Sequence, residues 1–109
     1  MKLYIATPIN ARKEKTMKEK LRAARHRVEQ LKEILSEDDR FEDFKMISTF
    51  DLSHGVELPE EAALASCVCA VLTSDAIYLD HGWQGSKGCN LEYRAAKIYG
   101  KQIYEHDKM

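Results

Sequence analysis

Four short apolar runs, separated by stretches long enough for helices, limit the folds open to this chain. The runs lie at Lys2–Ala6, 45–50, 75–80 and Gln102–Glu105 and follow a strand pattern. Buried strands joined by helices of crossover length form a parallel sheet with helices on both faces. The sequence therefore predicts an α/β fold of three layers, with a Rossmann- or flavodoxin-like parallel sheet of about four strands.

Three stretches between these runs carry helix signals. Apolar residues recur at spacings of three and four over residues 11–35, where Asn10 is a candidate N-cap. A second helix is expected from Pro59 to about residue 73, because proline loses no needed N–H donor in a first turn. A third is expected over 87–99, with Gly100 as a left-handed stop. The apolar stripe of the first helix consists of Met17, Leu21, Ala24, Val28, Leu31 and Leu35.

Length and composition narrow the class of protein. The 109 residues suffice for one domain, residues 1–109, and not for two cores of ordinary size. Apolar residues make up 44% of the chain and charged residues 32%, which favours a soluble globular domain over a disordered chain or a membrane protein. The formal net charge is -1, so no overall field attracts a nucleic acid polymer or an anionic membrane.

Charge is distributed unevenly along the chain. Residues 11–32 carry an excess of Lys and Arg, whereas residues 33–61 carry an excess of Asp and Glu. This pattern predicts a solvated amphipathic helix followed by an acidic surface loop at 36–43. The alternative is a docking face.

The cysteines argue against a disulfide framework and against a metal site. Their number is odd, and the N-terminus lacks the apolar stretch of a secretory signal. We therefore expect a reducing, cytoplasmic location. Cys67 and Cys69 form a CxC pair without a second pair or a histidine at zinc-ligand spacing, so no metal and no cofactor are expected.

Three loops are expected to carry function, because ligands of parallel α/β sheets bind beyond the carboxyl ends of the strands. These loops are 7–12, 51–58 and 80–87. The third is the most informative, since its glycines allow close approach to a ligand and it feeds a helix that opens at Ser86. The free N–H groups of such a helix start could hold a phosphate or a carboxylate. The alternative is an ordinary N-cap at Ser86.

Glu92 lies in the second turn of the third helix, next to the expected core stripe of Leu91, Ala95 and Ile98. Its carboxylate either points into the cleft or is solvated on the helix surface. The Tyr4 hydroxyl could approach this helix if the first strand lies beside the third. The alternative is an ordinary core tyrosine.

The remaining aromatic and histidine candidates give weaker signals. Trp83 lies in a Gly-flanked loop where burial is difficult, so it either walls a pocket and stacks on a planar ring or joins the core. His54 and His81 lie on ligand-side loops, but neither has a serine or cysteine at a recognisable motif spacing. A catalytic triad is therefore not predicted.

The sequence resembles the nucleoside 2-deoxyribosyltransferase-like superfamily, in particular a small branch of it without an assigned function, in four segments: KLYIATPI, TSDAIYLDHGW, SKGCNLE and YRAAKIYGKQI. The resemblance covers most of the chain. It implies that Glu92 attacks the anomeric carbon of a deoxyribosyl group, releases the base and forms a covalent sugar–enzyme ester, which water or a second base resolves. It also implies that Tyr4 orients this carboxylate and that Ser86 binds the phosphate of a 5'-monophosphate.

The first loop gains a role from the same resemblance, because in relatives it contributes to the sugar or phosphate pocket. Other candidates follow from their place between the third strand and the third helix. The candidate substrate-binding residues are Ser86, Gly88, Thr7, Pro8, Ile9, Trp83 and Asp80.

One position departs from the superfamily pattern. An aspartate that serves base recognition or protonates the leaving base is expected eight residues before Asp75, where this chain has Cys67. A neutral thiol is a poorer proton donor than a carboxyl group. Asp51, Asp80 or His81 could supply the acid instead.

We therefore expect an N-glycosidic bond hydrolase or transferase that acts on a (deoxy)nucleoside or nucleoside 5'-monophosphate through a covalent glycosyl-glutamate intermediate. The alternatives are a non-catalytic nucleotide-binding module of the same fold and a small structural or partner-binding protein. The expected partner is a small-molecule nucleoside or nucleotide, with no nucleic acid polymer and no membrane. A homo-oligomer is also expected, because relatives complete each site with residues of a neighbour.

Overall fold

A four-stranded parallel sheet forms the centre of the computed structural model, which describes residues 1–9, 12–52 and 60–108. The strands are β1 (Lys2–Ala6), β2 (Lys45–Ser48), β3 (Ala76–Leu79) and β4 (Gln102–Glu105). They lie in the order β2-β1-β3-β4, and every pairing is parallel. The central strands β1 and β3 are almost wholly buried, as parallel strands covered on both faces must be.

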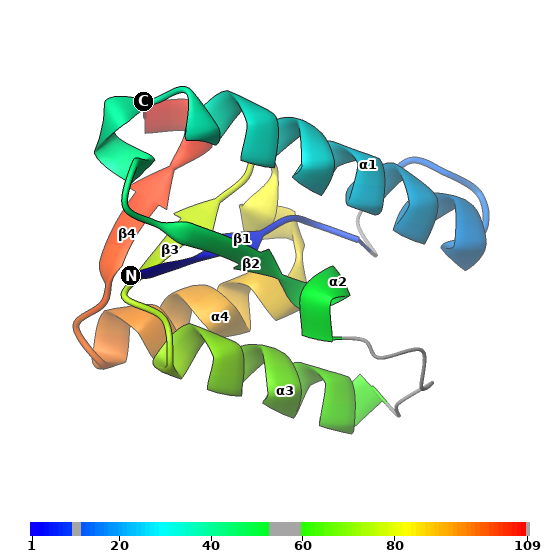
Figure 1. The fold of residues 1–109 in the computed structure, drawn as a ribbon. Helices are drawn as coiled ribbons and strands as arrows, with labels where there is room; N and C mark the ends of the chain where they lie inside the picture. Colours follow the sequence, from blue (N-terminus) through cyan, green and yellow to red (C-terminus); the bar gives the residue numbers. More distant parts are fainter. Residues whose placement is uncertain (10–11, 53–59, 109) are drawn as a thin grey trace.

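Helices cover both faces of this sheet (Figure 1). One face carries α1 (Met17–Ser36) and the 3-10 turn η1 (Asp39–Phe41), and the other carries α3 (Glu60–Leu72) and α4 (Lys87–Ile98). The remaining elements are α2 (Thr49–Leu52), η2 (Trp83–Gly85) and η3 (His106–Lys108). The structure confirms the predicted α/β fold of three layers.

Alternation along β1 decides which side chains reach which layer. Successive residues of a strand point to opposite faces of the sheet. Leu3 and Ile5 join the core cluster beneath α1, whereas Tyr4 and Ala6 join the cluster beneath α3 and α4. The Tyr4 side chain is therefore enclosed between β1 and the two helices of that layer.

The first helix begins at Met17, and the expectation of a start near residue 11 is wrong. Thr16 is the N-cap, and its Oγ1 accepts a hydrogen bond from the backbone N–H of Glu19 at 3.1 Å. Thr and Glu three residues apart form a capping-box sequence, which is a stronger start signal than a single asparagine. Asn10, the expected cap, lies outside the described residues.

The second strand ends at Ser48, two residues earlier than expected, because the chain turns there into α2. The Asp51 carboxylate accepts a hydrogen bond from the Ser48 backbone N–H at 2.8 Å, and Ser48 Oγ accepts one from the Phe50 N–H at 3.2 Å. These hydrogen bonds replace the backbone bonds that would continue the pairing of β2 with β1. The remainder of the expected loop, including His54, and the expected helix start at Pro59 lie outside the described residues.

The helix α1 extends past the sheet at the edge where the strands end (Figure 1). A helix of its 20 residues is about 30 Å long, whereas the strands of four or five residues span about 13 to 17 Å. Val28 and Leu31 are buried, but Met17 and Leu21 of the same stripe are 49% and 41% exposed. In the part of the chain that is described, no helix is both long and apolar enough to span a membrane.

Replacing Thr16 with Ala should destabilise the protein by about 1 kcal/mol, because the Glu19 N–H loses its cap. Urea denaturation measures this free energy of unfolding. Lys18→Ala, an exposed change in the same turn, is the control and should shift it by less than about 0.5 kcal/mol. Equal effects of the two changes would contradict the assigned helix start.

Candidate functional site

A buried carboxyl group lies between α4 and the sheet. Glu92, in the second turn of α4, is only 6% exposed. It shares the buried stripe of this helix with Cys89 and Ala96, at spacings of three and four residues. Glu92 therefore lies in the centre of the contact between α4 and the sheet.

The expected core stripe of Leu91, Ala95 and Ile98 is wrong. Leu91 and Ile98 are 43% and 77% exposed, and Ala95 is only partly buried. The helix instead meets the sheet through the small side chains of Cys89 and Ala96, which let the backbone approach closely. Because α4 turns Glu92 toward the sheet, this residue is not the solvated surface glutamate that the sequence also allowed.

Tyr4 lies opposite Glu92 on the central strand β1. Its side chain is fully buried, and the nearby Glu92 and Cys67 of α3 both contribute to raising the pKa of its hydroxyl. The phenol O–H donates to the Glu92 carboxylate when that group is ionised. The structure therefore brings Tyr4 and Glu92 together. Cys67, which stands where the superfamily pattern has an aspartate, lies near the same hydroxyl.

Burial sets the protonation of this pair. Loss of solvation raises the pKa of Glu92 from 4.5 to about 7, and the hydrogen bond from Tyr4 opposes this rise only in part. Burial, followed by the negative charge of Glu92, raises the pKa of Tyr4 well above 10. At neutral pH the phenol is therefore a proton donor to a carboxyl group that is about half ionised.

A fourth polar group extends this cluster toward β2. Cys67 Sγ lies 3.2 Å from Thr49 Oγ1 at the start of α2. The partly buried Thr49 and Cys67 thus lie next to the buried Tyr4 and Glu92, and we call these four side chains, which come from four different elements, the buried polar chain. Sequence reasoning missed Thr49, because its only signal is that it follows a strand.

The start of α4 carries the features of an anion site. Ser86 is the N-cap, and its Oγ accepts a hydrogen bond from the Cys89 N–H at 3.3 Å. Its hydroxyl proton can still be donated to a ligand. Among the described residues, the backbone N–H groups of Lys87 and Gly88 have no acceptor. A methyl group on Gly88 would make only ordinary contacts, 3.6 Å from Leu64, so steric need does not explain this glycine.

The first loop packs beside the loop that precedes α4. The Asp80 N–H donates to the Ala6 carbonyl at 2.9 Å, which joins the ends of β1 and β3. Pro8 is buried, and its Cγ would lie 3.9 Å from a Cβ on Gly82, whose left-handed φ of 82° favours glycine. Ile9 is half-buried.

Thr7 is buried at the carboxyl edge of β1, and its Oγ1 has no hydrogen-bond partner in the described part of the protein. An unsatisfied buried hydroxyl costs about 1 to 3 kcal/mol. Such a group is one that a bound ligand would satisfy. Thr7 therefore adds a second, independent sign of a ligand at this edge of the sheet.

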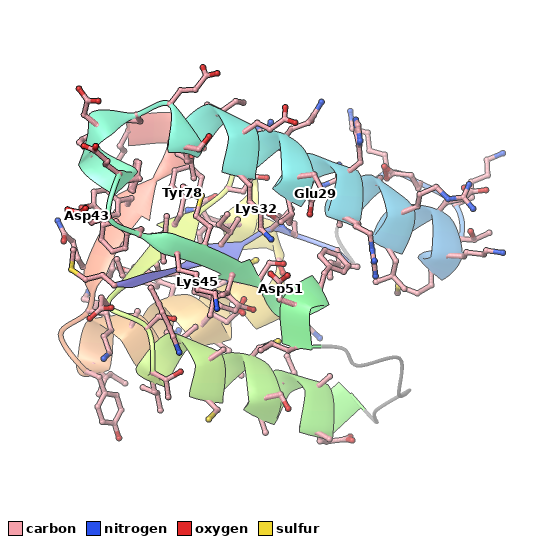
Figure 2. The ribbon with its side chains drawn as sticks, viewed as in Figure 1. Glu29, Lys32, Asp43, Lys45, Asp51 and Tyr78 are labelled. Carbon is pink, nitrogen blue, oxygen red and sulfur yellow. The ribbon has the colours of Figure 1, made fainter. Side chains whose placement is uncertain are left out.

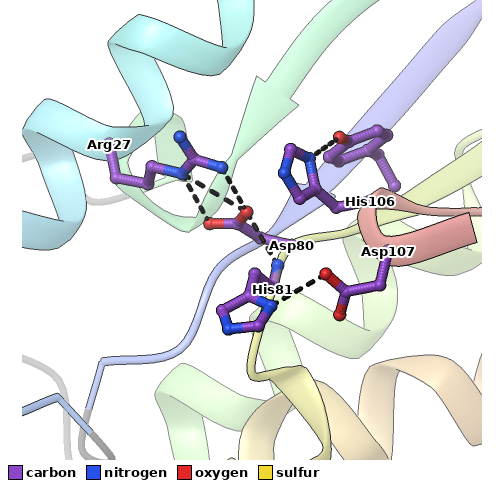
Figure 3. A network of polar contacts seen from close by, with 6 residues as sticks. Arg27, Asp80, His81, His106 and Asp107 are labelled. Atoms are coloured by element: carbon purple, nitrogen blue, oxygen red, sulfur yellow. Dashed lines mark hydrogen bonds and ion pairs between the residues drawn. The ribbon is translucent and has the colours of Figure 1, made fainter. Parts of the chain in front are cut away.

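Asp80 is held by an ion pair on the opposite side of the sheet (Figure 3). Arg27 of α1 donates to both carboxylate oxygens, with distances of 3.0 Å from Nε and 2.9 Å from a terminal nitrogen. The His81 backbone N–H donates to the same carboxylate at 2.8 Å. Because Arg27 and the His81 N–H hold both carboxylate oxygens, the structure gives Asp80 a positioning role.

The other two candidate acids are also engaged. Asp51 and Lys32 of α1 point toward each other (Figure 2), and their charged groups lie 3.1 Å apart. The His81 ring is exposed, and its Nδ1 lies 2.8 Å from Asp107 of η3 (Figure 3). The neighbouring His106 pairs with the Tyr78 hydroxyl at 2.6 Å.

Trp83 is buried, and the expectation that this ring is difficult to bury is wrong. The turn η2 folds the indole into the core cluster that contains Tyr4, with its centroid 4.8 Å from that of Tyr93. Of the two interpretations of Trp83, a pocket wall or a core residue, the structure therefore shows the core residue.

Two grooves between described residues lie away from Glu92. A groove of about 580 Å³ runs between β2, α2 and α3, and a second of about 380 Å³ follows the outer side of α4. Tyr4, Thr7, Ser86 and Glu92 line neither groove. Within residues 1–9, 12–52 and 60–108, no group of three or more His, Cys, Asp and Glu side chains could hold a metal ion.

Replacing Glu92 with Gln should change how stability depends on pH. The folded pKa of about 7 exceeds 4.5, so the stabilisation from this group is present below pH 4.5 and is lost as pH rises through 7. As pH rises from 5 to 8, the wild type should lose about 2 to 3 kcal/mol of its free energy of unfolding relative to Glu92→Gln. Urea denaturation measures it.

Glu33→Gln, an exposed change on α1, is the matched control and should follow the wild type at every pH. A constant difference between Glu92→Gln and the wild type over this range would contradict the raised pKa.

The comparisons with known proteins identify the family. A family model described as a domain of unknown function, DUF4406, matches residues 1–105. No curated protein and no solved structure matches the chain. Because the family model covers nearly the whole sequence, the chain belongs to the DUF4406 family.

Proposed function

We propose that this protein is an N-glycosidic bond hydrolase or transferase that acts on a (deoxy)nucleoside or a nucleoside 5'-monophosphate. One observation carries the proposal. A buried carboxyl group on α4, Glu92, is hydrogen-bonded by a buried tyrosine of the central strand, close to where ligands bind in parallel α/β sheets. The resemblance to the nucleoside 2-deoxyribosyltransferase-like superfamily points to the same residues.

A lone carboxylate suits this chemistry. The Glu92 oxygen attacks the anomeric carbon, so a carbon–oxygen bond forms while the bond to the base nitrogen breaks and its electron pair leaves with the base. The transition state resembles an oxocarbenium ion, which a nearby anion stabilises. Water or a second base then displaces Glu92 and restores the free carboxylate.

The hydrogen bond from Tyr4 lowers the pKa of Glu92 and so favours its ionised form, against the larger effect of burial. Because only the ionised form of Glu92 is a nucleophile, the rate should rise as pH passes through about 7. The leaving base takes up a proton from solvent water. Asp51 and Asp80 are bound to Lys32 and Arg27, so we do not assign them this step.

The start of α4 favours a substrate with a phosphate. Its N–H groups, which have no acceptor among the described residues, and the Ser86 hydroxyl are the groups that bind phosphate at helix starts, where the helix dipole also favours an anion. The Thr7 hydroxyl, which has no partner in the part of the chain that the structure describes, lies at the same edge of the sheet. We therefore favour a 5'-monophosphate over a free nucleoside. A nucleotide substrate and three free cysteines both fit a cytoplasmic location.

The alternative is a nucleotide-binding module without turnover. Cys67 favours it, because a neutral thiol occupies the position where the superfamily pattern has an aspartate, and the structure places this thiol against Tyr4. Such a module would keep the phosphate site and bind a monophosphate without breaking it.

Chromatography of free base from a panel of ribo- and deoxyribonucleosides and their 5'-monophosphates tests the proposal. We expect base release by the wild type, a loss of at least about 100-fold in Glu92→Gln, and a loss of about 10-fold in Tyr4→Phe. Glu33→Gln should retain wild-type activity. If no substrate releases base but a monophosphate raises the melting temperature, the enzyme proposal is wrong and the protein is the nucleotide-binding module.

We also propose that a second copy of the chain covers the overhanging start of α1. Met17 and Leu21 continue the buried stripe of this helix into solvent. The helix carries Lys18 and Arg22 near its start and Glu37 directly after its end. Two antiparallel copies of α1 would therefore oppose unlike charges.

Sedimentation equilibrium tests this association. The wild type should have the mass of a dimer, and Leu21→Glu should have the mass of a monomer, because a charge would enter the contact. Ile34→Glu alters an apolar side chain on another face of α1 that is already exposed, and should remain dimeric. A monomeric wild type would contradict the proposal.

A further inference from the structure

The larger of the two grooves has no part in the proposed reaction. It has a volume of about 580 Å³ and follows β2 between α2 and α3, and we call it the β2 groove. Tyr4 and Glu92 do not line it. Its volume lies in the range of small-molecule binding sites, so its lining can be examined for the kind of ligand that it suits.

Two lysines lie side by side at one end of the β2 groove. Lys2 of β1 and Lys45 of β2 are partners in the parallel register, and both side chains line the groove. Because neighbouring strands lie about 5 Å apart, the two positive charges repel each other. Among the described residues, no ion pair involves either ammonium group.

The acidic residues near this end of the sheet and in the groove are bound to other groups. Asp75 accepts a hydrogen bond from the Lys2 backbone N–H at 2.7 Å. Asp51 and Lys45 lie at opposite ends of β2 (Figure 2), and the Asp51 carboxylate pairs with Lys32 at 3.1 Å. An anion between the two unpaired ammonium groups would therefore relieve their repulsion.

Protection of the sheet edge explains only one of these lysines. Lysines on edge strands prevent pairing with strands of other molecules. This role suits Lys45, because β2 is an edge strand of the sheet. It does not suit Lys2, because β1 lies between β2 and β3. The pair of charges therefore indicates a ligand more strongly than Lys45 alone would.

The remainder of the β2 groove favours an aliphatic ligand. Ile47, Leu52 and Ala70 line it, and no aromatic side chain does so among the described residues. Flat rings such as nucleobases are bound by stacking on aromatic side chains, which this groove lacks. The four residues of β2 span about 13 Å, so an extended chain can lie along the strand.

We propose that the β2 groove binds a small aliphatic molecule with an anionic head group, either a carboxylate or a phosphate. Lys2 and Lys45 hold the head group, and the chain lies along β2 over Ile47 toward Leu52. This site does not depend on the proposed function, because neither Tyr4 nor Glu92 lines the groove.

The experiment is an NMR titration of the isotope-labelled full chain with octanoate, octyl phosphate and acetate, each below its critical micelle concentration. Octanoate and octyl phosphate should give saturable shifts of the backbone amides of Lys45, Ile47 and Leu52. Acetate should bind at least about 10-fold more weakly than octanoate, because it has no chain to bury. Tighter binding of octanoate or of octyl phosphate identifies the head group.

Variants of the lysines test the head-group site. Lys45→Met removes the charge and keeps a long side chain, and it should weaken octanoate binding by about 3- to 5-fold. The double variant with Lys2→Met should weaken it by about 10-fold. Both lysines are exposed, so the variants should fold. Lys18→Met, an exposed change on α1, is the matched control and should bind octanoate as the wild type does.

Equal octanoate affinities of the wild type and the double variant would overturn the proposal, as would the absence of saturable shifts up to about 10 mM. Shifts confined to Met17 and Leu21 would place the chain on the exposed start of α1 and would also overturn it. The Gly88 amide reports separately on the start of α4. Shifts confined to Gly88 would support the proposed phosphate site and contradict a site in the β2 groove.

Discussion

The burial of one carboxyl group against the central strand governs what this site can do. Alternation along β1 turns Tyr4 toward α3 and α4, and the small Cys89 and Ala96 side chains let α4 approach that strand. Glu92, on the same stripe, is thereby removed from water with Tyr4 as its donor. The opposition of burial and this hydrogen bond holds the pKa of Glu92 near neutrality, where a small change in its surroundings changes its charge.

The two faces of the sheet contribute differently to this site. On the α1 side, Arg27 holds the Asp80 carboxylate and so fixes the end of β3 and the loop that leads to α4. On the other side lies the buried polar chain. The start of α4, capped by Ser86, lies at the edge that both sides share, as does the Thr7 hydroxyl, which no described residue satisfies. Groups that must hold a ligand are therefore supported by rigid elements on each side.

The sequence predicted the fold and the pairing of the central strand with α4, because buried strands of KLYIA type leave few alternatives. It did not predict which face of α4 is buried. Periodicity favours Leu91 over Cys89, whereas close helix–sheet packing favours the smaller side chain. Trp83 was misjudged because a loop residue can fold back into a core. The ion pair of Arg27 and Asp80 joins residues 53 positions apart, which no spacing rule anticipates.

The central claim is that Glu92 forms a covalent bond to a sugar, and mass spectrometry of the trapped intermediate tests it most directly. A nucleoside 5'-monophosphate with fluorine at C2' slows the breakdown of a glycosyl ester, because fluorine destabilises the oxocarbenium-like transition state. We predict that the protein gains the mass of one fluorinated sugar phosphate and that this mass maps to the peptide containing Glu92. Release of base from natural substrates without such an adduct, or with an adduct on another residue, would contradict it.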